Sequence, residues 1–273
     1  MSVMPVITAI VLIALLVGTG GLFYSLYKSE NVGGPAILAG LCIGLFLWLA
    51  YLVWPPFPAV SVVLVVLAAA VTLVLFRINA GVLPKGLAVA AASLVVLLLA
   101  WQGLLISWLN AEVVSALEVL NPGGSAGTAL VVYHPGKSGF QKKANVAFAE
   151  GLVSNGWRVE ITTASSQAPT DLSGYDLLVL GAPTYDWKPA KRIQQYVSGI
   201  GDLAGQRTVT IVSGLGYTEL SGPAMERLVR EANGDLVTPL ILWTAAPNEE
   251  MYGLSDAVEI MHRAAREIPL PGG

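Results

Sequence analysis

The sequence contains few residues of the kinds that hold metals and metal-based cofactors. Cysteine occurs once, at Cys42, and histidine twice, at His134 and His262. One cysteine cannot form an intramolecular disulfide, an iron–sulfur cluster or a cysteine-based zinc site, so no metal site is expected. Neither histidine lies in the apolar first part of the chain, which excludes a membrane haem ligated by two histidines of this subunit.

Charge is also scarce in the first 109 residues. Only Lys28, Glu30, Arg77 and Lys85 are charged there, a net of about +2. A transporter or pump acting alone is therefore not expected, because intramembrane charges mark ion and substrate paths. The remainder of the 15 basic and 18 acidic side chains leaves residues 110–273 with a net charge of about −5. Such a domain is a poor candidate for binding nucleic acid, which requires a basic face.

Four long apolar stretches fill this first part. They cover residues 5–27, 34–54, 57–76 and 87–109. Each has about the 20 residues that a helix needs to cross a hydrocarbon core of about 30 Å. The sequence therefore predicts a four-span transmembrane anchor over residues 1–109, an all-α region in contact with the lipid bilayer. The first stretch is expected to be retained, because no basic segment precedes it as in a signal peptide.

Two features of the predicted anchor leave alternatives open. Gly40 and Gly44 form a GxxxG step, which suits close packing either within the anchor or against another membrane subunit. The basic residues Lys28, Arg77 and Lys85 lie in the first and third connections, so the positive-inside rule places the following domain outside the cytoplasm.

The composition changes after residue 109. Residues 110–126 are interpreted as an exit segment and linker, with an amphipathic helix over 110–120 and a flexible stretch over 121–125 that contains Pro122, Gly123 and Gly124. Residues 127–273 have the composition of one globular domain with a core of its own.

Strand and helix patterns alternate in this domain. Apolar runs predict strands at residues 128–133, 157–163, 175–181, 207–212 and 236–243, and helices are predicted at 139–154, 190–198, 221–232 and 255–267. This alternation is typical of the α/β class, with a five-stranded parallel sheet covered by helices on both faces. Ligands of such folds bind at the carboxyl ends of the strands.

Three loops at those carboxyl ends contain the candidate binding residues. The loop after the first strand suits a phosphate, because its glycines can turn N–H groups toward an anion at a helix N-terminus. The loops after the third and fourth strands contain rings that can stack on a flat ligand. The candidate residues are Gly136, Lys137, Ser138, Gly139 and Gln141 in the first loop, Pro183, Thr184, Tyr185 and Trp187 in the second, and Gly214, Gly216 and Tyr217 in the third.

The run from Tyr175 to Tyr185 (YDLLVLGAPTY), followed by Lys188 and Pro189, resembles the flavodoxin family over residues 127–268. The resemblance implies a flavodoxin-like five-stranded parallel sheet sandwich that binds FMN without a covalent bond and shuttles electrons. The first loop departs from the family's hydroxyl-rich phosphate motif. Phe140 and Gln141 replace an Asn and a Thr, and Pro135 removes a backbone donor.

Two hypotheses follow. The first is a membrane-anchored electron carrier that binds FMN and exchanges electrons with a membrane or soluble redox partner protein. No catalytic acid–base pair is evident, so a substrate-converting flavoenzyme ranks lower. The second is a flavin-free, degenerate flavodoxin fold that serves as an accessory subunit of a larger membrane complex. FMN is made and loaded in the cytoplasm, as the resemblance implies, so the first hypothesis favours a cytoplasmic domain, against the charge count.

Overall fold

The computed structural model describes residues 43–50, 64–66, 68, 101–215, 218–244 and 248–271. The chain divides into two compact units, Pro5–Leu105 and a unit that contains Ile106–Gly273. The predicted span 5–27 lies outside the described residues, as do Gly40 of the GxxxG step and most of the other three spans. Residues 43–50 and 101–109 are helical. Within the described parts of the chain, no helix is long and apolar enough to cross a membrane.

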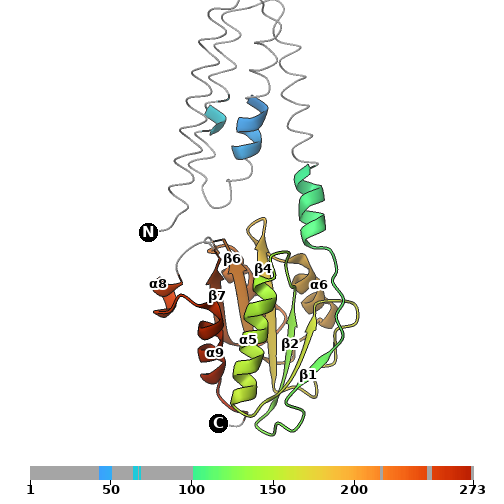
Figure 1. Ribbon diagram of the computed structural model, residues 1–273. Coiled ribbons are helices and arrows are strands. Elements are labelled where there is room, and N and C mark those ends of the chain that lie inside the picture. Colours follow the sequence, from blue (N-terminus) through green and yellow to red (C-terminus); the bar gives the residue numbers. More distant parts are fainter. Residues whose placement is uncertain are drawn as a thin grey trace, which may run out of the picture. The chain divides into compact units, whose positions relative to one another are not determined.

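The second unit is built on a sheet with five parallel strands, as predicted. These are β2 (Thr128–Tyr133), β3 (Arg158–Thr163), β4 (Leu177–Tyr185), β6 (Arg207–Gly214) and β7 (Asp235–Trp243). They are ordered β3-β2-β4-β6-β7, with β2 at the point where the order reverses (Figure 1). Counted along the chain this is 2-1-3-4-5, the order of flavodoxin-like sheets.

Helices cover both faces of the sheet. Helices α5 (Phe140–Ser154) and α9 (Ala257–Arg266) pack together on one face, and α6 (Lys191–Ile200) and α7 (Ser221–Glu231) lie on the other (Figure 1). The short helix α8 (Glu249–Tyr252) precedes α9.

The strand sequences explain why two layers of helix are needed. In β2, Ala129 and Val131 face the core under α5 and α9, whereas Leu130 and Val132 face the core under α6 and α7. All four side chains are fully buried. A strand that is apolar on both faces requires cover on both, and its loops can then run to either side.

Two short antiparallel strands enlarge the predicted five-stranded sheet to seven. Strand β1 (Glu118–Leu120) pairs with β3, and β5 (Lys188–Pro189) pairs with β4. The amphipathic helix predicted for residues 110–120 is therefore wrong. Hydrogen bonds to β3 hold this segment extended: the Ser115 N–H donates to Thr163 Oγ1 at 3.0 Å, and the Thr163 N–H donates to Ser115 Oγ at 3.0 Å.

The stretch predicted to be a flexible linker is also ordered. Asn121 Nδ2 donates to the Trp157 carbonyl at 3.0 Å, and the Gly124 N–H donates to the Asn121 carbonyl at 2.9 Å. A Cβ on Gly124 would lie only 2.5 Å from the Arg158 nitrogen. This turn thus packs against the start of β3 and forms an ordered connection between β1 and β2.

Gly181 gives a test of how closely α5 packs on the sheet. A Cβ at this position in β4 would overlap the carboxamide of Asn145, a fully buried residue of α5. We expect Gly181→Ala to lower the free energy of unfolding by about 1–3 kcal/mol, as overpacking does in a rigid core. Chemical denaturation measures the loss. Gly174→Ala is the matched control, because nothing lies within 4 Å of its Cβ, and an equal loss in both variants would contradict the packing.

Candidate functional site

The candidate site lies at the carboxyl edge of the sheet, where β2 has β3 on one side and β4 on the other. The chain leaves β2 toward α5 on one face and leaves β4 toward α6 on the opposite face. The two loops diverge at this point, and doubly wound folds bind ligands in the crevice between such loops.

Two glycines shape the loop between β2 and α5. Gly136 has φ 68° and Gly139 has φ 74°, a region that side chains with a Cβ rarely adopt. A Cβ on Gly136 would lie 3.4 Å from the Tyr185 hydroxyl, so the loop also passes close to the end of β4. Gly139 is the N-cap of α5 and has open space around it.

The N-terminus of α5 presents donors to this loop. The Phe140 N–H donates to Ser138 Oγ at 3.3 Å, and the Lys143 N–H donates to the Gly139 carbonyl at 3.0 Å. Among the described residues, nothing accepts the N–H groups of Gln141 and Lys142. The first turn contains no acidic side chain. A helix end of this kind attracts an anion, because its N–H groups and its dipole both favour negative charge.

His134 occupies the base of the loop and is buried. Its Nδ1 accepts the Gly136 N–H at 3.2 Å, and its Nε2 lies 3.4 Å from the Ala111 carbonyl, an arrangement that assigns the ring proton to Nε2. Burial lowers the pKa of His134, so the neutral ring is favoured. This histidine therefore joins the loop to the exit segment and holds one of the loop's N–H groups.

Tyr185 and Lys137 are also engaged within the protein. The Tyr185 ring meets His134 edge to face, with ring centroids 6.0 Å apart. Burial raises the pKa of the Tyr185 hydroxyl, and a hydrogen bond from the Lys137 backbone partly opposes this rise. The Lys137 ammonium lies 4.7 Å from the ring centre of Trp108. Of the predicted phosphate-binding residues, Lys137, Ser138 and Gly139 are exposed.

Gln141 is oriented differently from what a phosphate ligand requires. Its side chain is buried, and Nε2 donates to the Ile211 carbonyl of β6 at 2.9 Å. Asn145, one turn later, donates through Nδ2 to the Gln141 carbonyl at 2.7 Å. Positions 141, 145 and 148 share one face of a helix, the face that packs on the sheet. This spacing could have predicted that the Gln141 side chain is buried.

Phe140 packs on the core side of α5. It lines a hollow of about 290 Å³ together with Trp243 and Asp256. The aromatic ring that replaces the expected Asn thus lies toward β7 and not over the exposed Ser138 and Gly139.

The second loop forms a tight hairpin between β4 and β5. Asp186 and Trp187 have φ values of 48° and 64°, and Tyr185 pairs with Lys188. Two central residues at positive φ match the twist of a two-residue hairpin. The predicted residues Pro183, Thr184 and Tyr185 lie on β4 itself, and Trp187 is half-buried at the tip.

The third loop approaches the second. A Cβ on Gly214, the last residue of β6, would lie 2.7 Å from Thr218 and 3.4 Å from Thr184 Oγ1. Thr184 Oγ1 is buried and has no hydrogen-bond partner among the described residues. The predicted residues Gly216 and Tyr217 lie outside the described residues.

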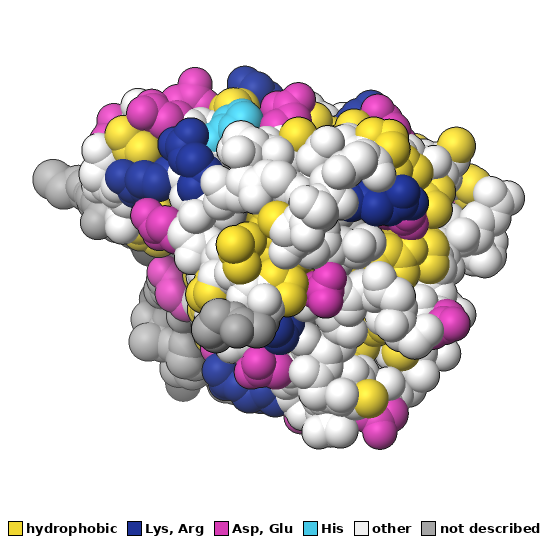
Figure 2. Space-filling view, turned by 90° about the horizontal axis from the view of Figure 1, so that it is seen from below, with side chains coloured by type: hydrophobic (Ala, Val, Ile, Leu, Met, Phe, Trp, Pro, Cys, Tyr) yellow, Lys and Arg dark blue, Asp and Glu magenta, His cyan; other side chains and the backbone are white. Residues whose placement is uncertain are grey.

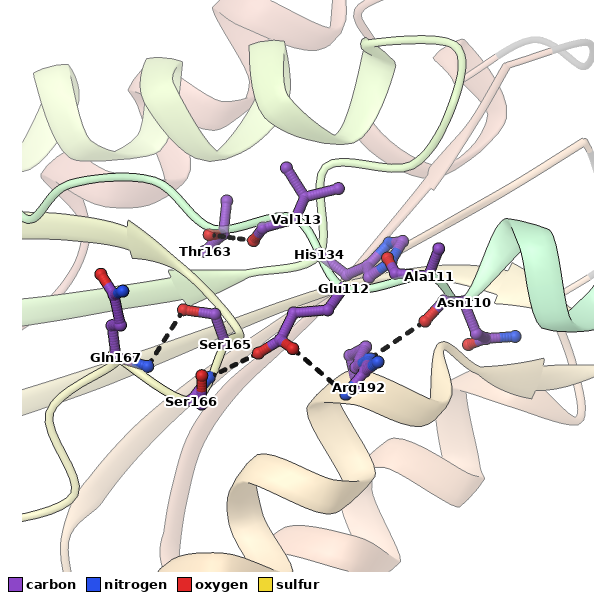
Figure 3. Close-up of polar contacts among 10 residues, drawn as sticks. All are labelled: Asn110, Ala111, Glu112, Val113, His134, Thr163, Ser165, Ser166, Gln167 and Arg192. Atoms are coloured by element: carbon purple, nitrogen blue, oxygen red, sulfur yellow. Dashed lines mark hydrogen bonds and ion pairs between the residues drawn. The ribbon is translucent and has the colours of Figure 1, made fainter.

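The exit segment contributes residues that the sequence did not indicate (Figure 3). Asn110 Oδ1 accepts the Lys191 N–H at 2.6 Å and so caps α6, whose own N-cap, Ala190, has no side-chain acceptor. Arg192 Nε donates to the Asn110 carbonyl at 3.0 Å. Glu112 accepts the Ser166 N–H at 2.6 Å and lies 3.9 Å from Arg192. No local pattern announces these contacts, because their partners are distant in sequence.

Comparison with known proteins supports no closer assignment. No family model matches the sequence, and no curated protein matches it. Similar solved structures include a flavodoxin from the domain Archaea, at 18% identity over 52% of this chain and 95% of the other, with a TM-score of 0.41. Flavodoxin 2 from Bacillus cereus is 22% identical over 50% of this chain and 94% of the other, with a TM-score of 0.41.

A third similar structure is a Streptococcus pneumonia TIGR4 flavodoxin, at 16% identity over 51% of this chain and 95% of the other, with a TM-score of 0.42. These identities are low. The flavodoxin-like α/β class of the domain follows from its own strand order and helix placement.

Within the described residues, no group of three or more His, Cys, Asp or Glu side chains is placed to hold a metal ion.

The neutral state of His134 predicts a dependence of stability on pH. The pKa of His134 is lower in the folded chain than in the unfolded chain, so the unfolded chain binds more protons as the pH falls below about 6.5. His134 therefore does not reduce the free energy of unfolding above that pH. The free energy of unfolding declines as the pH falls from there toward the lower pKa of the folded chain. We expect His134→Asn to flatten the decline in thermal unfolding midpoint between about pH 7 and pH 5. The control His262→Asn changes the only other histidine, and an unchanged slope in His134→Asn would contradict the assignment.

Proposed function

We propose that the chain is a membrane-anchored, flavodoxin-like redox protein that binds FMN at the carboxyl edge of its sheet and exchanges electrons with a partner protein. One observation carries the proposal: the uncommitted N–H groups at the start of α5 follow a loop with two left-handed glycines, and this loop passes close to Tyr185 of the β4–β5 hairpin. This combination offers an anion site beside a place for a flat ring.

The residues present fit the two ends of the cofactor. Ser138, Gly139 and the α5 N-terminus would hold the phosphate, with Lys137 as a nearby positive charge. Tyr185 and Trp187 would flank the ring system, as would Tyr217, which lies outside the described residues. The unpartnered Thr184 Oγ1 offers a polar contact between the ends of β4 and β6. Bound FMN supplies transfer of one or two electrons, and the protein supplies binding and electrostatics.

A second candidate function has its own support. His134 Nδ1 accepts the Gly136 N–H at 3.2 Å. One N–H group of the loop between β2 and α5, here called the phosphate loop, is thus already hydrogen-bonded within the protein. A flavin-free domain acting as an accessory subunit of a membrane complex would need no ligand at this loop.

Flavin binding distinguishes the two. The carrier function predicts that the purified protein is yellow, or that the colourless protein quenches FMN fluorescence on titration. We expect Gly139→Ala to weaken FMN binding on the order of tenfold, because it strains the left-handed N-cap where the phosphate would bind.

Gly205→Ala is the matched control for this substitution. Gly205 also has a positive φ, at 76°, and open space around its Cβ position, but it lies in the turn before β6. A protein that neither contains nor binds FMN would overturn the carrier function in favour of the accessory subunit.

The proposed anchoring has a separate test. The proposal places residues 1–109 in the membrane and the α/β domain on the cytoplasmic side. We expect protease added to sealed inside-out vesicles to digest the domain, and the same protease to leave it intact in right-side-out vesicles. Digestion in right-side-out vesicles only would put the domain on the other side, as the count of Lys28, Arg77 and Lys85 predicts.

A further inference from the structure

No free linker separates the end of the predicted fourth span from the α/β domain. The span is predicted to end at residue 109, and Asn110 already contacts both Lys191 and Arg192 of α6. The next residue, Ala111, contacts His134 beneath the phosphate loop. The carboxyl edge of the sheet is therefore fixed to the point where the chain would leave the membrane.

Trp108 and Lys137 form a contact suited to a membrane interface. Trp108 is 58% exposed, and the Lys137 ammonium lies 4.7 Å from its ring centre. Tryptophan prefers the headgroup layer of a bilayer. A lysine on its ring keeps the charge accessible while its stem rests on apolar surface.

Two more basic residues contact the exit segment, Lys191 through its backbone N–H and Arg192 through its side chain. Lys191 is exposed and has no anionic partner among the described residues, whereas Glu112 partly offsets Arg192 at 3.9 Å. We call Lys137, Lys191 and Arg192 the basic collar, since each contacts a residue between Trp108 and Glu112. On the neighbouring hairpin, exposed Lys188 offsets exposed Asp186.

The opposite end of the domain has a different character. Figure 2 shows that basic and acidic side chains are interspersed there, with apolar side chains between them. The domain as a whole has a net charge of about −5, so an anionic membrane surface would repel it unless cations faced that surface.

We propose that the basic collar binds the phosphate groups of anionic phospholipids and holds the carboxyl edge of the sheet at the membrane surface. The inference rests on the proposed membrane anchoring and does not depend on flavin. In this position the candidate site opens toward the headgroup layer. For the proposed electron carrier, the redox partner would then be a component of the membrane and not a protein that diffuses in bulk solution.

The test uses the full chain purified in a neutral detergent. Short-chain phosphatidylglycerol is titrated against it, with phosphatidylcholine of the same chain length as the uncharged comparison. We expect tighter binding of phosphatidylglycerol, and a loss on the order of tenfold in the double variant Lys137→Gln/Lys191→Gln. The control Arg227→Gln/Arg230→Gln removes the same charge from exposed positions near the end of α7, and its affinity should not change.

Lys191→Gln alone keeps the proposal testable if the double variant does not fold, and its expected loss is roughly fivefold. Equal affinity for the two lipids, or an equal loss in the α7 control, would overturn the collar. A chain that binds no FMN but retains lipid selectivity would overturn the carrier function alone. A chain that does not fractionate with membranes would overturn both the anchoring and the collar.

Discussion

The pairing of β2 with β3 on one side and with β4 on the other determines where the candidate residues lie. Parallel strands bring their carboxyl ends to one edge, and the reversal of strand order at β2 sends α5 and α6 to opposite faces. The loop at Gly136 and the end of β4 at Tyr185 become neighbours only for this reason. Both depend on a strand that is buried on both faces, with Leu130 and Val131 fully enclosed on opposite sides.

Competition for the donors of the phosphate loop decides whether this edge can bind a phosphate. A neutral hydrogen bond contributes about 0.5–1.5 kcal/mol, whereas one to a charged group contributes about 1.5–3 kcal/mol. Nothing among the described residues accepts the N–H groups of Gln141 and Lys142, so a phosphate would bond to them without a competing acceptor. Releasing Gly136 from buried His134 is less favourable, because an unsatisfied ring nitrogen costs about 1–3 kcal/mol. The loop thus has donors for an anion even with the His134 contact intact.

The elements of the α/β domain were largely predictable, because they depend on local pattern. The apolar run Thr128–Tyr133 matches β2 residue for residue, and Arg207–Gly214 extends its predicted strand by only two residues. The exit segment was not predictable. Ser115 adopts an extended conformation because of hydroxyl and backbone bonds to Thr163, which lies 48 residues away. Periodicity within a window cannot encode such a partner.

In the candidate site, too, features set by local sequence were predictable and features set by distant partners were not. Gly136 and Gly139 were predicted to let the loop turn its N–H groups, and both have the left-handed backbone that permits such a turn. Gln141 was assigned to the loop by its alignment with a family motif, but its place on the inner face of α5 directs its amide to Ile211. The role of His134 depends on the carbonyl of Ala111, which lies in the exit segment 23 residues earlier, so no motif around residue 134 could reveal it.

Flavin binding and lipid binding place different demands on the same edge of the sheet. The proposed flavin site needs uncommitted N–H groups and aromatic surface, which the backbone of α5 and the β4–β5 hairpin provide. The basic collar needs exposed ammonium groups near the exit segment; that of Lys137 lies over Trp108, and Lys191 is an exposed residue whose backbone contacts Asn110. Lys137 alone is shared, since its loop adjoins the proposed phosphate site and its side chain reaches Trp108. Its ammonium cannot serve a lipid phosphate and a cofactor phosphate equally, so occupation of one site would weaken the contact of Lys137 with the other.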